Sequence, residues 1–183
     1  MTEFEKMLDG ALYNSSDIEL VKLRDRAKMI CYKYNNLSPD LNVEKLKYLE
    51  ELFDQNLDNP IIEAPFHCDY GFNIKVGKNF YANYNLVILD VNKVTFGDNV
   101  FIGPNCGFYT AGHPVDLSVR NSGLEYGYPI TVGNNVWIGG NVSVLPNVRI
   151  GNNVVIGAGS VVTHDIEDNS VAYGNPCKVV KEI

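Results

Sequence analysis

Basic residues are scarce in this chain, and they never form a run along the sequence. Its 183 residues include 15 Lys and Arg against 22 Asp and Glu, which gives a formal net charge of −7. Nucleic acids and anionic membranes attract basic surfaces, so this balance makes both of them poor partners. We expect a protein that binds neither nucleic acid nor a membrane.

Long apolar runs are also absent. No segment approaches the roughly 20 apolar residues that a helix needs to span a bilayer. The opening residues Met-Thr-Glu-Phe-Glu-Lys are too polar to begin a signal peptide. The sequence therefore predicts a cytoplasmic protein.

Cysteine and histidine are few and widely spaced. The cysteines form no CxxC pair and have no zinc-binding spacing; they are Cys31, Cys68, Cys106 and Cys177. We interpret them as buried or incidental thiols, with Cys106 pointing into the core. The three histidines are His67, His113 and His164.

What the sequence does contain is a six-residue repeat. Each hexad has an apolar residue at its first and third places, and consecutive hexads begin at Ile130, Val136, Val142, Val148 and Val154. This alternation is typical of a short strand, and the Gly, Asn and Asp residues that follow tolerate the positive φ of a sharp corner. Three hexads make one triangular turn of about 18 residues. The repeat predicts a mostly β chain folded as a left-handed parallel β-helix.

The repeat also runs upstream to Ile74, with two interruptions. From Leu86 to Val94 the spacing is eight residues rather than six, which predicts a two-residue bulge around Asp90. After Cys106 the next clear hexad begins only at Ile130, an excess of 18 residues over one hexad. The coil is therefore expected to keep its register while residues 112–129 leave it as a protruding loop, and such excursions are usually functional.

The beginning of the chain carries no hexads and has a helical pattern. One helix is expected from Glu3 to Gly10, with Gly10 as its C-cap. A second is expected to follow Ser16, because Ser16 and Glu19 match a capping box, and to end at Asn35-Asn36.

A third helix is expected before the coil. Ser38-Pro39 supplies a cap and a first-turn proline, and Asn59-Pro60 would end the helix. We therefore expect two units, a helical segment over residues 1–58 and a β-helix domain over residues 59–183.

His113 lies at the mouth of the protruding loop, within Tyr-Thr-Ala-Gly-His-Pro-Val. Histidine is the side chain best suited to take a proton near neutral pH. A loop beside a coil face can cover a groove and exclude water from it. His113 is therefore the candidate general base.

Several motifs resemble the maltose and galactoside O-acetyltransferases. They are residues 7–13 (MLDGALY), 79–85 (NFYANYN), 111–115 (AGHPV), 129–139 (PITVGNNVWIG) and 172–177 (AYGNPC). The likeness runs from Met7 to Ile183. It implies acetyl transfer from acetyl-CoA to a hydroxyl of a sugar of the maltose, glucose or galactoside type. It also implies a homotrimer with active sites between neighbouring β-helices.

The resemblance implies roles for residues of the acceptor site. His113 would deprotonate the acceptor hydroxyl, which then attacks the thioester directly, and the amide of Asn83 would fix a sugar hydroxyl against the imidazole. Asp69 lies where the family contacts the sugar. Glu125, on the returning limb of the loop, would orient the imidazole or bind the acceptor.

Asp17 and Asp90 are further acceptor-binding candidates, although their alignment needs gaps. Structural roles are open alternatives for most of these residues. Asn83 can be a β-helix corner residue, Asp17 the first-turn acid of a helix, and Asp90 a turn residue in its bulge. Glu125 can be a solvated loop charge.

The resemblance also implies a donor surface. Gly140, Ala158 and Thr163 match positions where the family lays the pantetheine arm, and strand-edge amides there can pair with its amides. Trp137 would flank the thiol end, or alternatively form a trimer contact.

The last residues of the chain would meet the nucleotide phosphates. Lys178 and Lys181 stand where the family commonly has arginines. The positive charge is kept, but the paired hydrogen bonds that a guanidinium can donate to a phosphate are lost. His164 stands where the family usually has lysine. We therefore expect weaker CoA binding than in a lysine-bearing relative.

Other functions are compatible with the same coil. The γ-class carbonic anhydrases bind a metal through three histidines, but the spacing of His67, His113 and His164 argues against shared coordination, and we expect no metal requirement. A hexapeptide-repeat acetyltransferase with a non-sugar acceptor, such as serine or an antibiotic, is the main alternative. A non-catalytic sugar-binding scaffold is another, and the presence of His113 in its loop argues against it.

Overall fold

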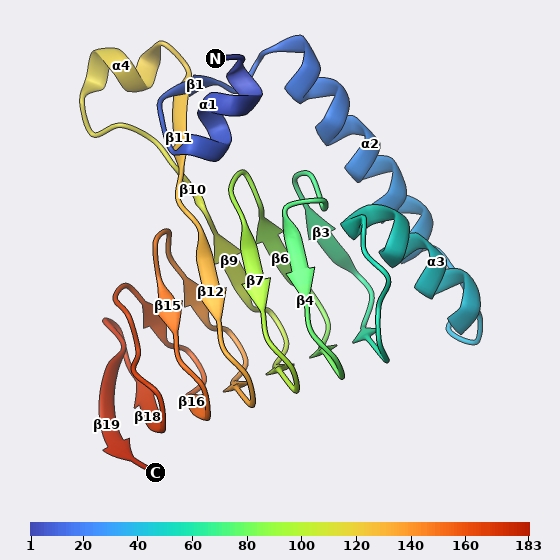
Figure 1. Ribbon diagram of the computed structural model, residues 1–183, viewed down its shortest axis with the longest axis vertical. Coiled ribbons are helices and arrows are strands. Elements are labelled where there is room, and N and C mark those ends of the chain that lie inside the picture. Colours follow the sequence, from blue (N-terminus) through green and yellow to red (C-terminus); the bar gives the residue numbers. More distant parts are fainter.

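The computed structural model describes residues 1–183 as a stack of parallel β-coils with helices packed at one end (Figure 1). The coils run from helices α2 and α3 to a C-terminal hairpin at the opposite end (Figure 1). No helix combines the length and the apolar character that crossing a membrane requires.

Three sheets form the sides of the coil, and their strands are parallel except in the last hairpin. The first has the order β15 (Arg149–Ile150), β12 (Ile130–Val132), β7 (Val94–Phe96), β4 (Ile74–Val76). The second has the order β19 (Lys178–Glu182), β18 (Ser170–Tyr173), β16 (Val154–Ile156), β13 (Trp137–Ile138), β8 (Phe101–Ile102), β5 (Tyr81–Ala82), β2 (Ile61–Ile62). The third has the order β17 (Val161–Val162), β14 (Ser143–Val144), β9 (Gly107–Tyr109), β6 (Leu86–Leu89), β3 (Phe66–Cys68). The predicted hexapeptide-repeat β-helix is confirmed.

The apolar pattern places the core inside the coil. In β7, for example, Val94 and Phe96 are buried on either side of the exposed Thr95, as a two-residue period requires. At the corners, asparagines adopt positive φ and stack in ladders, with the amide of Asn79 donating to Asn99 at 2.9 Å. The core and the corners thus use the same six-residue repeat.

The spacing between turns changes along the stack. Asn79 and Asn99 are 20 residues apart, whereas Asn134 and Asn152 on later turns are 18 apart. The two additional residues sit at corners such as the one at Asp90. The coil begins before Ile74, where the recognisable repeat starts, because β2 and β3 already pair with β5 and β6. This first turn does not show the six-residue spacing in the sequence, because the corner after Cys68 is irregular.

Three helices precede the coil, and three of their predicted boundaries were wrong. Helix α1 (Glu3–Asp9) ends at Gly10 in the left-handed region, as expected. Helix α2 (Ile18–Asn35) is capped by Asp17 rather than Ser16, because the carboxylate of Asp17 accepts from the N–H of Glu19.

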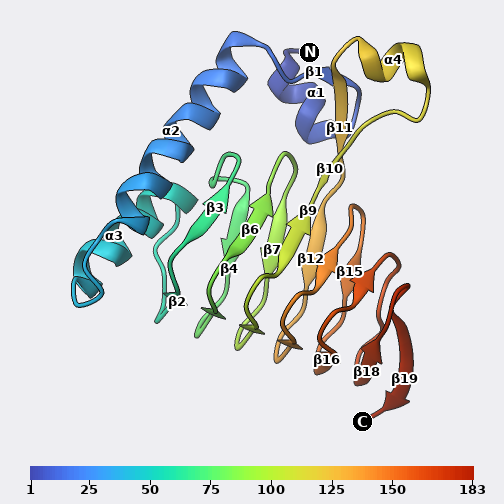
Figure 2. The same cartoon turned by 180° about the vertical axis from the view of Figure 1, so that it is seen from behind.

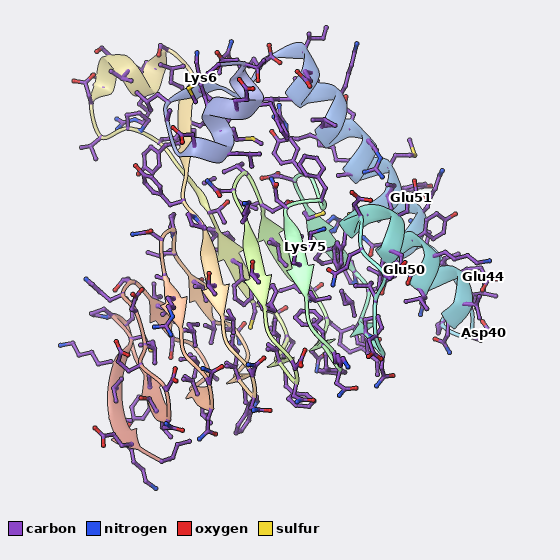
Figure 3. The ribbon with its side chains drawn as sticks, viewed as in Figure 1. Lys6, Asp40, Glu44, Glu50, Glu51 and Lys75 are labelled. Carbon is purple, nitrogen blue, oxygen red and sulfur yellow. The ribbon has the colours of Figure 1, made fainter.

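Helix α3 (Asn42–Phe53) begins three residues after Pro39 and ends well before Asn59-Pro60. A turn occupies the predicted start, where the N–H of Leu41 donates to the carbonyl of Ser38. At its other end, Lys75 donates to the carbonyls of Phe53 and Asp54 at 2.9 and 3.0 Å. Figure 3 shows Lys75 on the coil beside this helix. The ammonium group satisfies carbonyls that a helix end leaves unpaired.

The helices extend the core of the coil. Tyr34 from α2 and Phe53 from α3 belong to the same apolar cluster as the inward coil residues. Phe53 meets Phe66 edge to face, with ring centroids 5.9 Å apart. Burying this end of the stack removes a β-coil edge that would otherwise be open to association.

The protruding loop is confirmed and forms a small sheet of its own. It consists of β10 (Ala111–Gly112), α4 (Leu117–Asn121) and β11 (Leu124–Gly127), and β11 pairs with both β10 and the N-terminal β1 (Tyr13–Asn14). Figure 2 shows this arm beside α1, above the coil. The coil keeps its register across the arm, because Ile130 pairs with Val94, one turn earlier in the stack.

Candidate active site

A polar cavity lies where the arm, the N-terminal segment and a corner of the coil meet. Its volume is about 270 Å³, and it is lined by Tyr13, Ser15, Arg24, Asp69, Leu89, Val91, Ala111, His113 and Glu125. Three predicted site residues, Asp69, His113 and Glu125, are therefore brought together from distant parts of the sequence. We call this space the acceptor cavity.

His113 follows β10, at the point where the arm leaves the coil. Its side chain is exposed at the cavity, so the imidazole is open to a bound molecule. The pairing of β10 with β11 determines where His113 stands relative to Glu125, because Ala111 pairs with Gly127 on the returning limb.

Glu125 is held by the N-terminal segment. The hydroxyl of Tyr13 donates to its carboxylate at 2.8 Å, and the two residues are register partners in β1 and β11. Tyr13 is fully buried, and this burial, together with the carboxylate of Glu125, raises the pKa of the phenol far above its ordinary value. The phenol therefore keeps its proton and remains a donor to Glu125.

Asp69 contributes a second carboxylate, directly after β3. Burial raises the pKa of Asp69, and the nearby Glu125 raises it further, while the charge of Arg24 lowers it. Two carboxylates thus line the cavity, and hydroxyl donors are the natural ligands of such oxygens.

Arg24, from α2, is a cavity residue that our sequence analysis missed. Its guanidinium donates to the hydroxyl of Tyr70 at 2.7 Å and to the carbonyl of Ser15 at 2.6 Å. These bonds hold the cation beside Asp69. An arginine on an amphipathic helix carries no sequence signal of its own, since only the packing of α2 on the coil brings it to the cavity.

Asp90 does not lie where an acceptor could contact it, and our prediction for this residue is corrected. It is fully buried, and its carboxylate accepts from the N–H groups of Asp69, Tyr70 and Gly71 at 2.9, 2.9 and 2.7 Å. Burial raises the pKa of Asp90, while the hydrogen bonds from these backbone amides lower it in part. Asp90 therefore holds the corner that carries Asp69, and the next residue, Val91, lines the cavity instead.

Asp17 is the N-cap of α2, which is the structural role that we considered for it. Its carboxylate accepts from the N–H of Glu19 at 3.0 Å as the N-cap of α2, and it is absent from the residues that line the cavity. The neighbouring Ser15 lines the cavity instead. The geometry supports this capping role, and contact of Asp17 with an acceptor stays a prediction.

Asn83 lies apart from His113 within one chain. It follows β5 and lines a second cavity of about 420 Å³ with Tyr81, Phe101, Ile102, Gly103 and Trp137. Its side-chain oxygen accepts from the N–H of Tyr84 at 2.7 Å. Asn83 and His113 thus sit at the two ends of the sheet that contains β6 and β9, at different corners of the coil.

The predicted donor residues follow successive turns toward the C-terminal end. Gly140 and Ala158 lie on neighbouring turns, and the N–H of Gly159 donates to the carbonyl of Gly140 at 2.9 Å. A side chain at Gly139 would meet the backbone N of Ala158 at 2.6 Å, so this approach requires glycine. Trp137 is 59% exposed on β13.

The charged donor candidates lie at the end of the stack. Lys178 and Lys181 are exposed on β19, which forms the final hairpin (Figure 1). The hydroxyl of Thr163 and Nδ1 of His164 are 2.8 Å apart, just after β17. His67, His113 and His164 lie on different turns, and no group of three His, Cys, Asp or Glu side chains converges.

Known proteins are similar to this chain in both sequence and architecture. The family model described as the maltose acetyltransferase hexapeptide capping motif matches residues 6–55, and the bacterial transferase hexapeptide model matches residues 129–164. A maltose O-acetyltransferase from Clostridium difficile is 51% identical, with a TM-score of 0.99 over 100% of this chain and 98% of that one. The chain belongs to the maltose and galactoside O-acetyltransferase family.

Two further relatives support membership of this family. A galactoside acetyltransferase solved with coenzyme A is 43% identical, with a TM-score of 0.94 over 100% of this chain and 92% of that one. A Saccharomyces cerevisiae protein that is named as an acetyltransferase, although only provisionally, is 55% identical over 100% of this chain and 94% of its own length. The protein is an acetyltransferase of the maltose and galactoside type.

Proposed function

We propose that this acetyltransferase moves an acetyl group from acetyl-CoA to a hydroxyl of a sugar, with His113 as the general base. The observation that carries the proposal is the acceptor cavity, in which a solvent-open imidazole shares a polar space with the carboxylates of Asp69 and Glu125. A neutral polyol supplies the hydroxyl donors that two carboxylates can bind.

The reaction requires one proton to move twice. His113 takes the proton of the acceptor hydroxyl as that oxygen attacks the thioester carbonyl carbon. The carbon–sulfur bond then breaks, and the imidazolium returns the proton to the departing thiolate. One histidine can serve both steps, because an imidazole can take a proton and return it near neutral pH.

Asp69, Glu125 and Arg24 are proposed to bind the acceptor. The carboxylates accept from sugar hydroxyls, and the guanidinium, already fixed by Tyr70 and Ser15, donates to a sugar oxygen. The family resemblance supports glucose, maltose and galactosides as the compounds to test.

Acetyl-CoA is proposed to lie along the later turns. Gly140 and Ala158 leave the backbone accessible, and the solved galactoside acetyltransferase complex supports a coenzyme A site in this fold. Thr163 and Trp137 would border the pantetheine and its thiol. Lys178 and Lys181 would meet the phosphates, with His164 contributing less charge than the usual lysine.

We propose a homotrimer because Asn83 and His113 line different cavities within a single chain. The outer face of the sheet at Asn83 is an apolar ladder made by Ile61, Tyr81, Phe101, Trp137, Val155 and Val171. By contrast, the sheet of β4 and β7 presents Lys75, Thr95, Thr131 and Arg149. Association through the apolar face would bring Asn83 of one subunit toward His113 of another, where its amide can fix the acceptor hydroxyl.

The two segments of the chain would then divide the work. Residues 59–183 would carry acyl transfer, while residues 1–58 would supply Tyr13, Ser15 and Arg24 to the acceptor cavity. The helical segment would then serve the acceptor cavity in addition to covering the first turn of the coil.

The first test is thiol release from acetyl-CoA across glucosides, galactosides, maltose, serine, chloramphenicol and glucosamine. Sugar-dependent release that disappears in His113→Ala supports the proposal. Release only with serine, chloramphenicol or the amine of glucosamine would establish a different acceptor class. Failure to bind acetyl-CoA would favour a scaffold.

A mixing experiment tests the shared site. His113→Ala and Asn83→Ala variants are unfolded together, refolded and assayed. If each site takes these residues from different chains, up to about a quarter of the wild-type turnover returns on random assembly. A mixture as inactive as the separate variants would contradict a site between subunits.

A further inference from the structure

Two buried cysteines lie next to each other between α2 and β3. The Sγ atoms of Cys31 and Cys68 are 3.9 Å apart, and both residues belong to the core cluster. Cys31 comes from the N-terminal helices and Cys68 from the first turn of the coil, so this contact joins the two parts of the chain. Both thiols are free.

A cavity separate from the acceptor cavity reaches both thiols. Its volume is about 440 Å³, and it is lined by Lys28, Cys31, Tyr32, Asn35, Asn36, Pro65, His67 and Cys68. It shares no residue with the acceptor cavity. A small solute can therefore approach the sulfur atoms although little of either cysteine is exposed.

The segments that carry the cysteines are held together by other bonds. The side chain of Asn35 accepts from the N–H of Phe66 and donates to its carbonyl, both at 2.9 Å. The hydroxyl of Tyr34, the residue before Asn35, donates to the carbonyl of Ile62. These bonds keep the end of α2 beside β3, so the two sulfur atoms stay near each other.

We propose that Cys31 and Cys68 form a reversible intramolecular disulfide when a peroxide enters this cavity. A disulfide has a sulfur–sulfur distance of about 2.05 Å, so the two atoms must approach by about 1.9 Å. Side-chain rotation and a small shift of α2 on β3 supply that movement.

The proposed chemistry is a two-electron oxidation by hydrogen peroxide. The thiolate of one cysteine attacks a peroxide oxygen, the O–O bond breaks, and hydroxide leaves with a sulfenic acid formed. The second thiol attacks that sulfur, the S–S bond forms, and the S–O bond breaks to release water. Two thiols and one peroxide thus become one disulfide and two waters.

Cys31 is the proposed attacking residue. The two sulfur atoms are within hydrogen-bonding distance, and this contact lowers the pKa of Cys31 while it raises the pKa of Cys68. Thiolate character selects the cysteine that is oxidised first. Cys68 then acts as the resolving thiol.

The disulfide would also affect the acceptor site, a consequence that rests on the proposed function. Cys68 is followed directly by Asp69, whose N–H is fixed by Asp90. Pulling β3 toward α2 would displace Asp69 within the acceptor cavity. Oxidation should therefore raise the acceptor KM several-fold and leave the KM for acetyl-CoA unchanged, because the proposed donor residues lie on distant turns.

The test uses the native, full-length protein treated with hydrogen peroxide and then alkylated. Tryptic digestion without reduction should give a linked pair of peptides, residues 29–33 with residues 48–75, and dithiothreitol should separate them. Cys106 and Cys177 fall in other peptides and serve as internal controls. Cys31→Ala should abolish the link and make the acceptor KM insensitive to peroxide.

Clear outcomes would overturn the proposal. They are the absence of the linked peptide after oxidation of the folded protein, its formation only in urea, or equal linkage to Cys106 or Cys177. The peptide measurement needs no acetyl transfer. A linked peptide in a protein that acetylates no sugar would therefore support the disulfide and reject only its proposed effect on the acceptor site.

Discussion

The hydroxyl of Tyr13 and the carboxylate of Glu125 are joined by a 2.8 Å hydrogen bond across 112 positions of sequence. This bond connects the first strand of the chain to the returning limb of the arm, and both residues line the acceptor cavity. The N-terminal segment therefore does more than cover the end of the coil. It orients a carboxylate beside the candidate base.

Tyr13→Phe should weaken both the fold and acceptor binding. Removing the hydroxyl leaves a carboxylate without its buried donor, which costs about 1–3 kcal/mol in unfolding free energy. The acceptor KM should rise several-fold while the KM for acetyl-CoA stays constant. Urea unfolding and steady-state kinetics measure these effects, with the exposed Tyr32→Phe as control. Equal behaviour of the two variants would contradict the role of this bond.

His113→Ala should lower turnover by roughly 10²- to 10⁴-fold, the usual contribution of a positioned general base. The affinity for acetyl-CoA should be nearly unchanged, because His113 is proposed to move a proton at the reacting atoms and not to hold the pantetheine or the phosphates. His67→Ala, which removes an exposed histidine of β3, is the matched control. A loss below about tenfold would remove His113 from the proposed mechanism.

Asp69 should make the stability of the protein depend on pH. Because burial raises the pKa of Asp69 in the folded state, the native protein holds this proton at pH values where the unfolded chain has lost it. Its contribution to stability therefore falls as pH rises from its ordinary pKa to the raised one, and is constant below that window.

The comparison of wild type with Asp69→Asn isolates this effect. Unfolding free energies measured by urea from pH 3 to pH 8 should show the wild type losing stability relative to the variant, by at most about 1.4 kcal/mol per pH unit. A difference that stays constant, or that grows in favour of the wild type, would reject the assignment.

Asp90→Asn should destabilise the protein by about 2–4 kcal/mol. Three backbone N–H groups point at the carboxylate, and an amide would lose at least one acceptor and place its own donors against them. Thermal and urea unfolding measure the loss. Asp17→Asn is the matched control and should be nearly neutral, because asparagine is an equally good N-cap. Similar effects at both positions would contradict this account.

His164→Lys should lower the KM for acetyl-CoA by about two- to fivefold, the range expected for one exposed charge pair. The acceptor KM should not change. Raising the ionic strength should reduce the improvement, because salt screens surface charges. An unchanged KM for acetyl-CoA at low salt would show that residue 164 does not meet the phosphates.

The coil could be predicted because its information is local and repeated. Val94 and Phe96 point inward for the same reason as Ile130 and Val132, and each later hexad repeats the constraint. Even the register across the arm followed from counting residues. The first turn could not be recognised in this way, because its corner after Cys68 breaks the six-residue spacing.

The candidate site was only partly predictable. His113, Asp69 and Glu125 were selected by resemblance, and the structure places them around one cavity. For the two remaining acidic candidates, Asp17 and Asp90, a sequence does not say which carboxylates will accept hydrogen bonds from backbone amides. One caps a helix, and the other is buried at a corner.

The sequence by itself determined the β-helix, its inward faces, the arm and the family. Each of these depends on residues that are close together in the chain or repeated along it. Only the tertiary structure decided that Tyr13 holds Glu125, that Arg24 stands beside Asp69, and that Cys31 meets Cys68. These contacts join segments through the packing of α2 and β1 on the coil, and their geometry is a property of the whole core rather than of any local pattern.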